Sequence, residues 1–448
     1  MSDREGVTTQ RILPPRGLAA TLRQLGPGMI LSASIVGSGE LIATTTLGSR
    51  VGLGALWLIL VSCVIKVVVQ EELGRYTIMS GETTFRALDR VPGPRWRVSW
   101  VVWAWMVMYV GITFQLGGII GGTAQVFSLI QPAISIAAWS VIIAVVTIAL
   151  LAWGRYRFIE RAAMFMVVGF TVVTALGAAM IWRTPHAPSL QDIAAGLSFH
   201  LPDGGLAVAF AVFGITGVGA SELIYYPYWC LEKGYARFTG RNDGSSEWVA
   251  GARGWIRVMQ VDALVAMVVY TVATVAFYLL GASVLHGQNL IPAGHEMVQA
   301  LSRIYTTTLG PWAFYLFLAG AFFVLYSTIF SATASNARVV LDFLQMIHLV
   351  RTGDEAHRRF WLRVMVVVMV SLTTGWYLIG GEPVAMVLVG GIAQACMLPI
   401  IGFSTLYLRY RHFNSELRPR RWVDALLWLC STLMLSFAVY TLVSRLRA

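Results

Sequence analysis

Residues 37–42, Gly-Ser-Gly-Glu-Leu-Ile, and residues 219–224, Gly-Ala-Ser-Glu-Leu-Ile, decide how this chain folds. Each stretch is a run of small residues followed by Glu-Leu-Ile, and each lies inside a long apolar segment. An acidic side chain at the middle of a bilayer costs about 2.5–3.5 kcal/mol even on lenient scales, so a glutamate there is expected to serve a function. The two stretches therefore indicate a pair of related sites within a membrane.

The residues around these two stretches have the composition of a membrane protein. Of the 448 residues, 57% are hydrophobic and only 12% are charged. A soluble globular chain carries roughly 25% charged residues, and the polar surface of this chain would not cover so many apolar side chains. The composition excludes a soluble enzyme, a disordered protein and a nucleic-acid binder of the usual kind.

Apolar segments long enough to cross a bilayer recur along the whole chain. A transmembrane helix needs about 20 mostly apolar residues, and only helices and closed barrels satisfy their backbone hydrogen bonds in lipid. The alternating ten-residue strands of a barrel do not occur in the sequence. We therefore expect an all-α polytopic membrane protein with eleven transmembrane helices, near residues 27–48, 52–73, 99–127, 133–153, 162–182, 205–230, 258–284, 311–336, 362–380, 384–408 and 422–444.

Basic residues gather in alternate loops between these segments. The net charge is +11, and 27 of the 33 lysines and arginines lie in the amino-terminal segment or in the loops after the even-numbered spans. Because such residues favour cytoplasmic loops, the amino terminus is expected inside and, with eleven spans, the carboxyl terminus outside. Nothing in residues 1–26 reads as a cleavable signal peptide, so we expect a multi-pass protein of the inner or plasma membrane. Lys66 is expected near the inner end of the second span.

The two glutamates lie in equivalent positions of two halves of the chain. Glu40 falls in the first span and Glu222 in the sixth, 182 positions and five spans later. An odd number of spans between two copies gives them opposite orientations, which is typical of inverted repeats with a transport site at their interface. We expect repeats over residues 27–182 and 205–408, a cytoplasmic segment at 1–26, and an eleventh helix with the carboxyl terminus at 422–448.

Glycine and serine beside each glutamate favour an unwound stretch, which frees backbone carbonyls to bind an ion. Both carboxylates are then predicted to bind one cation between the broken first and sixth helices. Carboxylate, hydroxyl and carbonyl oxygens would make an all-oxygen, doubly negative site, which suits a hard divalent ion such as Mg²⁺ or Mn²⁺. In the alternative interpretation each glutamate is protonated, hydrogen-bonded and structural. The predicted binding residues are Glu40, Glu222, Gly37, Ser38, Gly219, Ser221 and Gln394.

Three further residues are candidates for lining a pathway to this site. Gln115 lies in the third span, and Tyr225 and Tyr226 follow the second glutamate. Core packing is the alternative for the tyrosines, and a supporting or packing role is the alternative for Gln394. The seven histidines fall in loops or at span ends and offer no central imidazole ligand.

Residues 26–29, Gly-Pro-Gly-Met, lead into residues 37–40, Gly-Ser-Gly-Glu. This run resembles the first span of the NRAMP (natural resistance-associated macrophage protein) metal-ion transporter family, where a Gly-Pro-Gly opening precedes an unwound Asp-Pro-Gly-Asn motif. Residues 48–57 and 70–81 are similar to that family in spacing, residues 217–228 align with its Met-Pro-His segment, and residues 390–399 align with its glutamine-containing one. The resemblance implies a leucine-transporter (LeuT) type fold and the transport of metal ions.

Several residues depart from the pattern of that family. Gly37 stands where the family has its metal-binding aspartate, and Glu40 where it has asparagine. Ala220 replaces the methionine that supplies a soft sulfur ligand, and Glu222 falls near the histidine. Gln115 lies in the region where the family carries an acidic pair associated with proton movement. These departures indicate a divergent, NRAMP-related branch whose site favours harder ions.

The leading hypothesis is a secondary-active transporter of divalent metal cations that works by alternating access. The alternatives are a LeuT-fold carrier of an organic or amine-containing solute and a channel or sensor that binds without cycling. No H-E-x-x-H, G-x-S-x-G or P-loop motif occurs, so neither an enzyme nor an ATP-driven pump is expected. The expected partners are the cation and the lipid bilayer, with no nucleic acid and no cofactor beyond the transported ion. The oligomeric state is open, and a monomer is compatible with the sequence.

Overall fold

The computed structural model describes residues 11–37, 39–153, 156–200, 205–351 and 353–447. The helices of the first five spans are α2 (Pro27–Ile35), η1 (Gly39–Thr44), α3 (Thr45–Val51), α4 (Leu56–Ser80), α6 (Trp100–Ile130), α7 (Ile136–Trp153) and α8 (Tyr156–Met180). The shorter elements of this half are α1 (Leu18–Leu22), η2 (Gly52–Ala55), α5 (Thr84–Leu88), η3 (Ile181–Arg183), α9 (Leu190–Gly196), and the two paired strands β1 (Arg95–Trp96) and β2 (Val98–Ser99).

The second half of the chain repeats this organisation. Its long helices are α10 (Leu206–Ile215), α11 (Ala220–Lys233), α13 (Ser246–Leu280), α15 (Ala313–Met346), α16 (Glu355–Leu378), α17 (Pro383–Arg411) and α18 (Arg421–Arg447). Its shorter helices are α12 (Tyr235–Thr239), η4 (Gly281–Leu285), η5 (His286–Gln288), η6 (Gly294–Glu296), α14 (Met297–Leu309) and η7 (Ser415–Leu417).

These helices account for all eleven expected spans. Among the described residues, eight helical stretches are long and apolar enough to cross a membrane, and the first of them, Pro27–Ser80, is 54 residues long and contains two expected spans. The fourth expected span lies in α7, with the apolar stretch Ile136–Ala152, and the fifth lies in α8 and η3, with the apolar stretch Thr171–Arg183. The expected number and order of spans are therefore confirmed.

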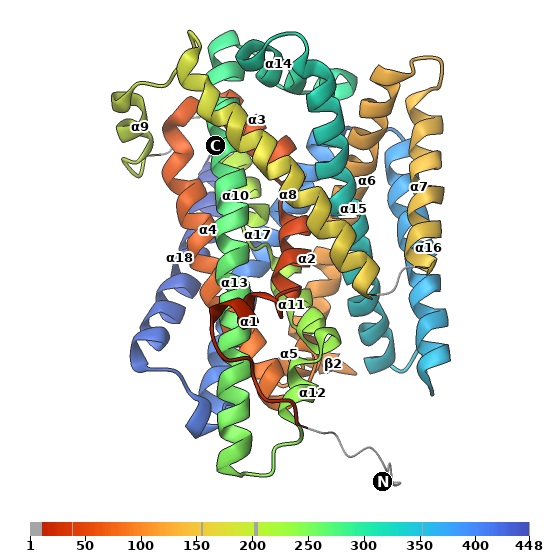
Figure 1. Ribbon diagram of the computed structural model, residues 1–448, viewed down its shortest axis with the longest axis vertical. Helices are drawn as coiled ribbons and strands as arrows, with labels where there is room; N and C mark the ends of the chain where they lie inside the picture. The colour runs from red at the N-terminus through yellow and green to blue at the C-terminus, as the bar shows by residue number, and fades with distance from the viewer. Residues whose placement is uncertain (1–10, 38, 154–155, 201–204, 352, 448) are drawn as a thin grey trace.

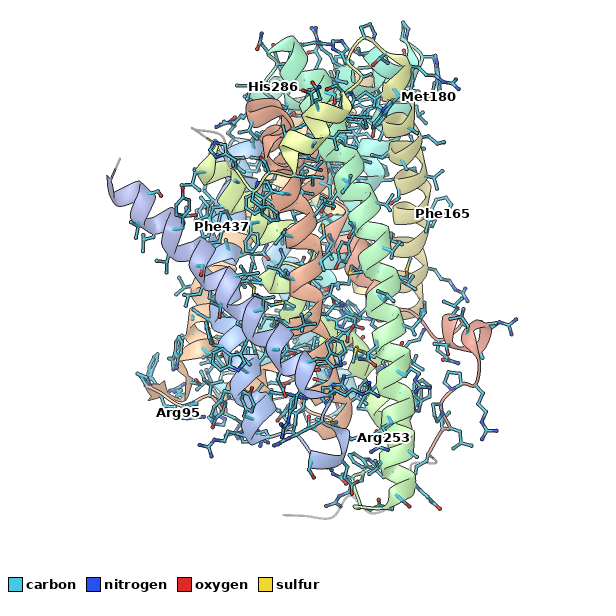
Figure 2. The ribbon with its side chains drawn as sticks, turned by 90° about the vertical axis from the view of Figure 1, so that its left-hand side faces the viewer. Arg95, Phe165, Met180, Arg253, His286 and Phe437 are labelled. Atoms are coloured by element: carbon cyan, nitrogen blue, oxygen red, sulfur yellow. The ribbon has the colours of Figure 1, made fainter. Side chains whose placement is uncertain are left out.

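Successive loops lie at alternate ends of the bundle, as the distribution of basic residues in the sequence predicts. Figure 2 shows Arg95, which follows the second span, and Arg253, which follows the sixth, at the same end of the molecule. Met180 and His286, which end the fifth and seventh spans, lie at the opposite end. One end of the bundle therefore carries the arginine-rich loops.

The first and sixth spans are both broken in the middle, as expected. Helix α2 ends at Ile35, and the chain resumes at Gly39 with η1, a turn of π-helix, before α3. Helix α10 ends at Ile215, and α11 begins at Ala220 after four non-helical residues. Figure 1 shows α2, α10, α11 and α17 in the middle of the bundle, with α18 along one edge and α7 and α16 along the other.

A glycine allows the sixth span to break against α4. Gly217 adopts a φ of +64°, a left-handed conformation that side chains other than glycine rarely take. A Cβ atom at this position would lie 2.9 Å from the Cα atom of Cys63 and 3.2 Å from the carbonyl oxygen of Ser62. Both the backbone conformation and the close approach to α4 therefore require glycine.

Small residues also bring α6 and α17 close together along much of their length. A Cβ atom at Gly111 would lie 2.6 Å from the Cβ atom of Ala393, and one at Gly118 would lie 2.7 Å from the carbonyl oxygen of Pro383. Interfaces of small residues are typical of membrane helices, because association within lipid gains no hydrophobic stabilisation and depends on close packing. This interface holds the third span, with Gln115, against the tenth span, with Gln394.

The amino-terminal segment is tied to the arginine-rich end. The guanidinium of Arg11 donates to the carboxylate of Asp243 at 2.5 Å, and the backbone N–H of Ile12 donates to the carbonyl of Phe238. Hydrogen bonds from Ser245, together with Arg11, hold the pKa of Asp243 at about 2. The Asp243 carboxylate therefore stays ionised at any physiological pH.

Candidate ion site at the broken helices

Glu40 lies in the π-helical turn that follows the break in the first span. Its side chain is fully buried. One carboxylate oxygen accepts a hydrogen bond from the Thr274 hydroxyl at 3.0 Å, and the other accepts one from the backbone N–H of Gly37 at 3.2 Å. Thr274 belongs to α13, so this carboxylate joins the first broken helix to the seventh span.

Glu222 lies in the first turn of α11, just past the break in the sixth span. Its Oε1 atom accepts hydrogen bonds from the Ser34 hydroxyl at 3.0 Å and from the Tyr225 hydroxyl at 2.7 Å. Ser34 belongs to α2, so these bonds join the two broken helices. The Oε2 atom is buried and has no hydrogen-bond partner among the described residues.

The amino terminus of α11 is held by a chain of two amides. The backbone N–H of Ser221 donates to Gln394 Oε1, and Gln394 Nε2 donates to Gln115 Oε1, both at 3.0 Å. A Cβ atom at Gly219 would lie 2.5 Å from Gln394 Oε1 and 2.6 Å from Glu222 Oε2, so these two oxygens converge on the glycine. The Ser221 hydroxyl is buried without a partner in the described part of the chain.

The structure brings most of the predicted binding residues to the two breaks. Glu40 and Gly37 flank the first break, Gly219, Ser221 and Glu222 the second, and Gln394 bonds to the backbone of the second. Ser38 lies outside the described residues. In the described residues no hydrogen bond joins the two carboxylates directly, and no group of three or more histidine, cysteine or acidic side chains is arranged to hold a metal. Ligation of an ion by these residues stays a prediction.

The predicted pathway residues have different surroundings. Tyr225 bonds to Glu222 and therefore belongs to the site itself. Tyr226 donates to Asp262 Oδ2 at 3.1 Å, and Asp262 accepts the backbone N–H groups of Gly26 and Gly28 at the start of α2. Tyr225 and Tyr226, which are adjacent in sequence, thus link the centre of the bundle to the arginine-rich end. A role of these tyrosines in ion passage stays a prediction.

The sequence and the fold match one family along almost the whole chain. The model of the Nramp family, natural resistance-associated macrophage protein-like, matches residues 28–444. The chain belongs to the Nramp family. It is 22% identical over 441 residues to the divalent metal cation transporter MntH of Deinococcus radiodurans, covering 98% of this chain and 94% of that protein. It is 23% identical to MntH of Bacillus subtilis, covering 96% and 94% of the two chains.

Solved structures agree with this assignment. A crystal structure of the Eremococcus coleocola manganese transporter superposes with a TM-score of 0.69 at 16% identity, covering 97% of this chain and 88% of that one. Mhp1, a nucleobase-cation-symport-1 family transporter, gives a TM-score of 0.56 at 13% identity, covering 98% and 93%. The chain has the LeuT-type fold with two inverted five-helix repeats, whose expected boundaries stay a prediction. As a member of the Nramp family it is a multi-pass membrane transporter and not an enzyme.

The surroundings of Gly37 bear on the predicted correspondence between this residue and the metal-binding aspartate of the Nramp family. A Cβ atom at Gly37 would lie 1.5 Å from Thr328 Oγ1 and 2.7 Å from Thr328 Cβ. Thr328 comes from α15 and donates to the carbonyl of Ser34 at 3.2 Å. Thr328 therefore fills the space that a side chain at position 37 would need.

Lys66 is the residue that the sequence interpretation misplaced. It was expected near the inner end of the second span, but it lies in the middle of α4 and is fully buried. Its ammonium group donates to the carbonyl oxygens of Phe213 at 2.7 Å and Thr216 at 2.5 Å, at the break between α10 and α11. A lone lysine inside an apolar span was the available signal, because such a residue is costly unless it has a partner.

Proposed function

We propose that this Nramp protein is a secondary-active transporter of hard divalent cations, Mn²⁺ or Mg²⁺, which it moves by alternating access. The ion binds between the two helix breaks, in contact with Glu40 and Glu222. The observation that carries the proposal is a pair of buried oxygens at the second break, Glu222 Oε2 and the Ser221 hydroxyl, which have no hydrogen-bond partner among the described residues. Buried oxygens left without hydrogen bonds are costly, and a bound cation would satisfy both.

The chemistry of the donors supports a hard ion. The carboxylates and hydroxyls at the breaks offer oxygen as a ligand atom, and Ala220 stands where the family has its methionine sulfur. Oxygen ligands suit magnesium and manganese, whereas thioether sulfur suits softer metals. With only two carboxylates, the site fits a cation that keeps part of its water shell, as magnesium commonly does. The MntH relatives are named as divalent metal cation transporters, which supports the same class of cargo.

The hydrogen bonds around the two glutamates support a coupling between ion binding and movement of the helices. Glu40 holds α13 through Thr274, and Glu222 holds α2 through Ser34. An ion that draws both carboxylates toward itself would compete with both bonds. Ion binding would thereby loosen each broken helix from its neighbour, as alternating access between two repeats requires.

The proposed placement is the cell membrane, with the amino terminus in the cytoplasm. The arginine-rich end of the bundle would then face inward, because basic loops favour the cytoplasmic side. The end that carries Met180 and His286 would face outward.

Calorimetry on the purified protein and ion flux into liposomes test the proposed function. Wild-type protein should bind Mn²⁺ saturably and take it up, with competition by Mg²⁺. Glu40→Gln and Glu222→Gln should each weaken binding by about tenfold or more, a loss of about 1.4 kcal/mol, and should slow uptake. Glu355→Gln, the same exchange at an exposed position in the first turn of α16, is the matched control.

Two results would overturn the proposal. Normal binding and uptake by both glutamine variants would show that the carboxylates are structural. Uptake that is indifferent to divalent metals but inhibited by organic amines would favour a carrier of an organic solute.

A further inference from the structure

Lys66 places a positive charge where a helix break exposes carbonyl oxygens. The last hydrogen bond of α10 runs from the backbone N–H of Thr216 to the carbonyl of Val212. The next carbonyl, that of Phe213, and the carbonyl of Thr216 both accept from the Lys66 ammonium. Half-helix carboxyl ends and unwound carbonyls of this kind are the groups that coordinate cations in transporters with broken helices.

The surroundings of Lys66 exclude solvent and acidic partners in direct contact. The side chain is fully buried, and the ammonium lies 5.0 Å from the centre of the Phe213 ring. In the part of the chain that the structure describes, Lys66 forms no salt bridge. It nevertheless lies within electrostatic reach of both Glu40 and Glu222.

Ser62, one turn earlier on α4, contacts the same two carbonyls. Its hydroxyl lies 3.0 Å from the Thr216 oxygen and 3.3 Å from the Phe213 oxygen. A hydroxyl donor is therefore already present at this helix end. The lysine adds a full charge, which costs several kcal/mol to bury unless it is compensated.

We infer that Lys66 is a built-in cation that fills a carbonyl site at the second helix break and balances one of the two carboxylates. This inference rests on the proposed function for the role of Glu40 and Glu222 as ligands. With both carboxylates ionised and the lysine protonated, an arriving ion meets a net charge of −1 from these three groups. Without it, the same ion meets −2, and the carbonyls of Phe213 and Thr216, which keep only the Ser62 hydroxyl as a donor, can accept a second cation.

Three variants separate the charge of Lys66 from its hydrogen bonds. Lys66→Gln keeps two N–H donors for the carbonyls and removes the charge. Lys66→Arg keeps the charge. Ser62→Ala removes the neighbouring donor and leaves the charge untouched, and is the matched control.

Calorimetric titration with Mn²⁺ gives the decisive comparison. Lys66→Gln should bind Mn²⁺ about tenfold more tightly than wild type, because a positive charge near the site has been removed. Lys66→Arg and Ser62→Ala should stay within about twofold of wild type. Lys66→Gln protein that is folded but binds Mn²⁺ no more tightly than wild type would overturn the inference.

A stability measurement tests the carbonyl site independently of transport. Lys66→Met can donate to neither carbonyl, so its thermal unfolding midpoint should fall, and added Mn²⁺ or Na⁺ should restore it saturably. A fall that no cation restores would mean that Lys66 only caps α10, and would overturn the inference.

The unfolding and binding measurements together separate this inference from the proposed function. If wild-type protein binds no Mn²⁺ in the calorimetric titration, the proposed function fails. Cation-dependent recovery of the unfolding midpoint of Lys66→Met would still support a cation site at the helix break.

Discussion

Gly37 lies against Thr328, at a position where the resemblance to the family predicts an aspartate. Thr328 Oγ1 occupies the point where a Cβ atom of residue 37 would stand. A side chain at position 37, such as the aspartate that the family resemblance predicts there, is therefore incompatible with Thr328 in its present place. The Glu40 carboxylate, three residues later, reaches back to the backbone N–H of Gly37.

We predict that Gly37→Asp neither folds normally nor creates a manganese site. Overpacking of this kind costs about 1–3 kcal/mol, so the thermal unfolding midpoint of the purified protein should fall. The double variant Gly37→Asp, Thr328→Gly should recover much of that loss, because the clashing side chain is gone. Gly353→Asp, in open space on a loop, is the control. A Gly37→Asp protein as stable as wild type would contradict this account.

The residues at the site differ in how far the sequence could reveal them. Glu40 and Glu222 were found because acidic residues are scarce in apolar spans and their flanking residues match. Thr328 gave no signal, because its importance comes from a contact with a residue 291 positions away. Lys66 is visible in the sequence, but the sequence interpretation places it near the inner end of the second span; only its burial against the Phe213 and Thr216 carbonyls shows its environment.

At the scale of elements, the two breaks have different geometry despite their similar sequences. The first break passes into a π-helical turn, and the second leaves residues 216–219 outside any helix. Glycine and serine beside each glutamate predicted both breaks, because such residues weaken a helix. The sequence did not predict the difference, since the second break depends on the close approach of Gly217 to α4.

We predict that Gly217→Ala destabilises the protein by about 2–4 kcal/mol, from backbone strain at positive φ and from the clash with Cys63. The matched control is Gly375→Ala in α16, where a Cβ atom would meet nothing within 4 Å. That control should be neutral or slightly stabilising, because alanine favours the helix. Thermal unfolding of both variants, with Mn²⁺ binding on the folded fraction, provides the measurement. Equal midpoints for the two variants would mean that the break tolerates a side chain.

At the scale of the whole molecule, the order of the basic loops in the sequence and their positions in the structure indicate the same number of spans. The alternation of arginine-rich loops predicted eleven spans, because one missed span would have inverted every later loop. The structure places Arg95 and Arg253 together at one end, as that alternation requires. The boundaries of the two repeats stay a prediction, which rests on the match between Glu40 and Glu222 and on the odd number of spans between them.

The orientation of the molecule gives the last prediction. A cysteine in place of Leu190, an exposed residue of α9, should react with a membrane-impermeant maleimide on intact cells. A cysteine in place of Arg253, exposed at the opposite end, should react only after permeabilisation. Wild-type protein supplies the background, because three of its four cysteines are buried and Cys396 lies within α17. The reverse pattern would place the arginine-rich end outside, and labelling of both cysteines in intact cells would contradict an odd number of spans between positions 190 and 253. Labelling of both cysteines would also remove the opposite orientation of the two glutamate-containing helices, on which the proposed central ion site depends, whereas the reverse pattern would leave that relative orientation intact.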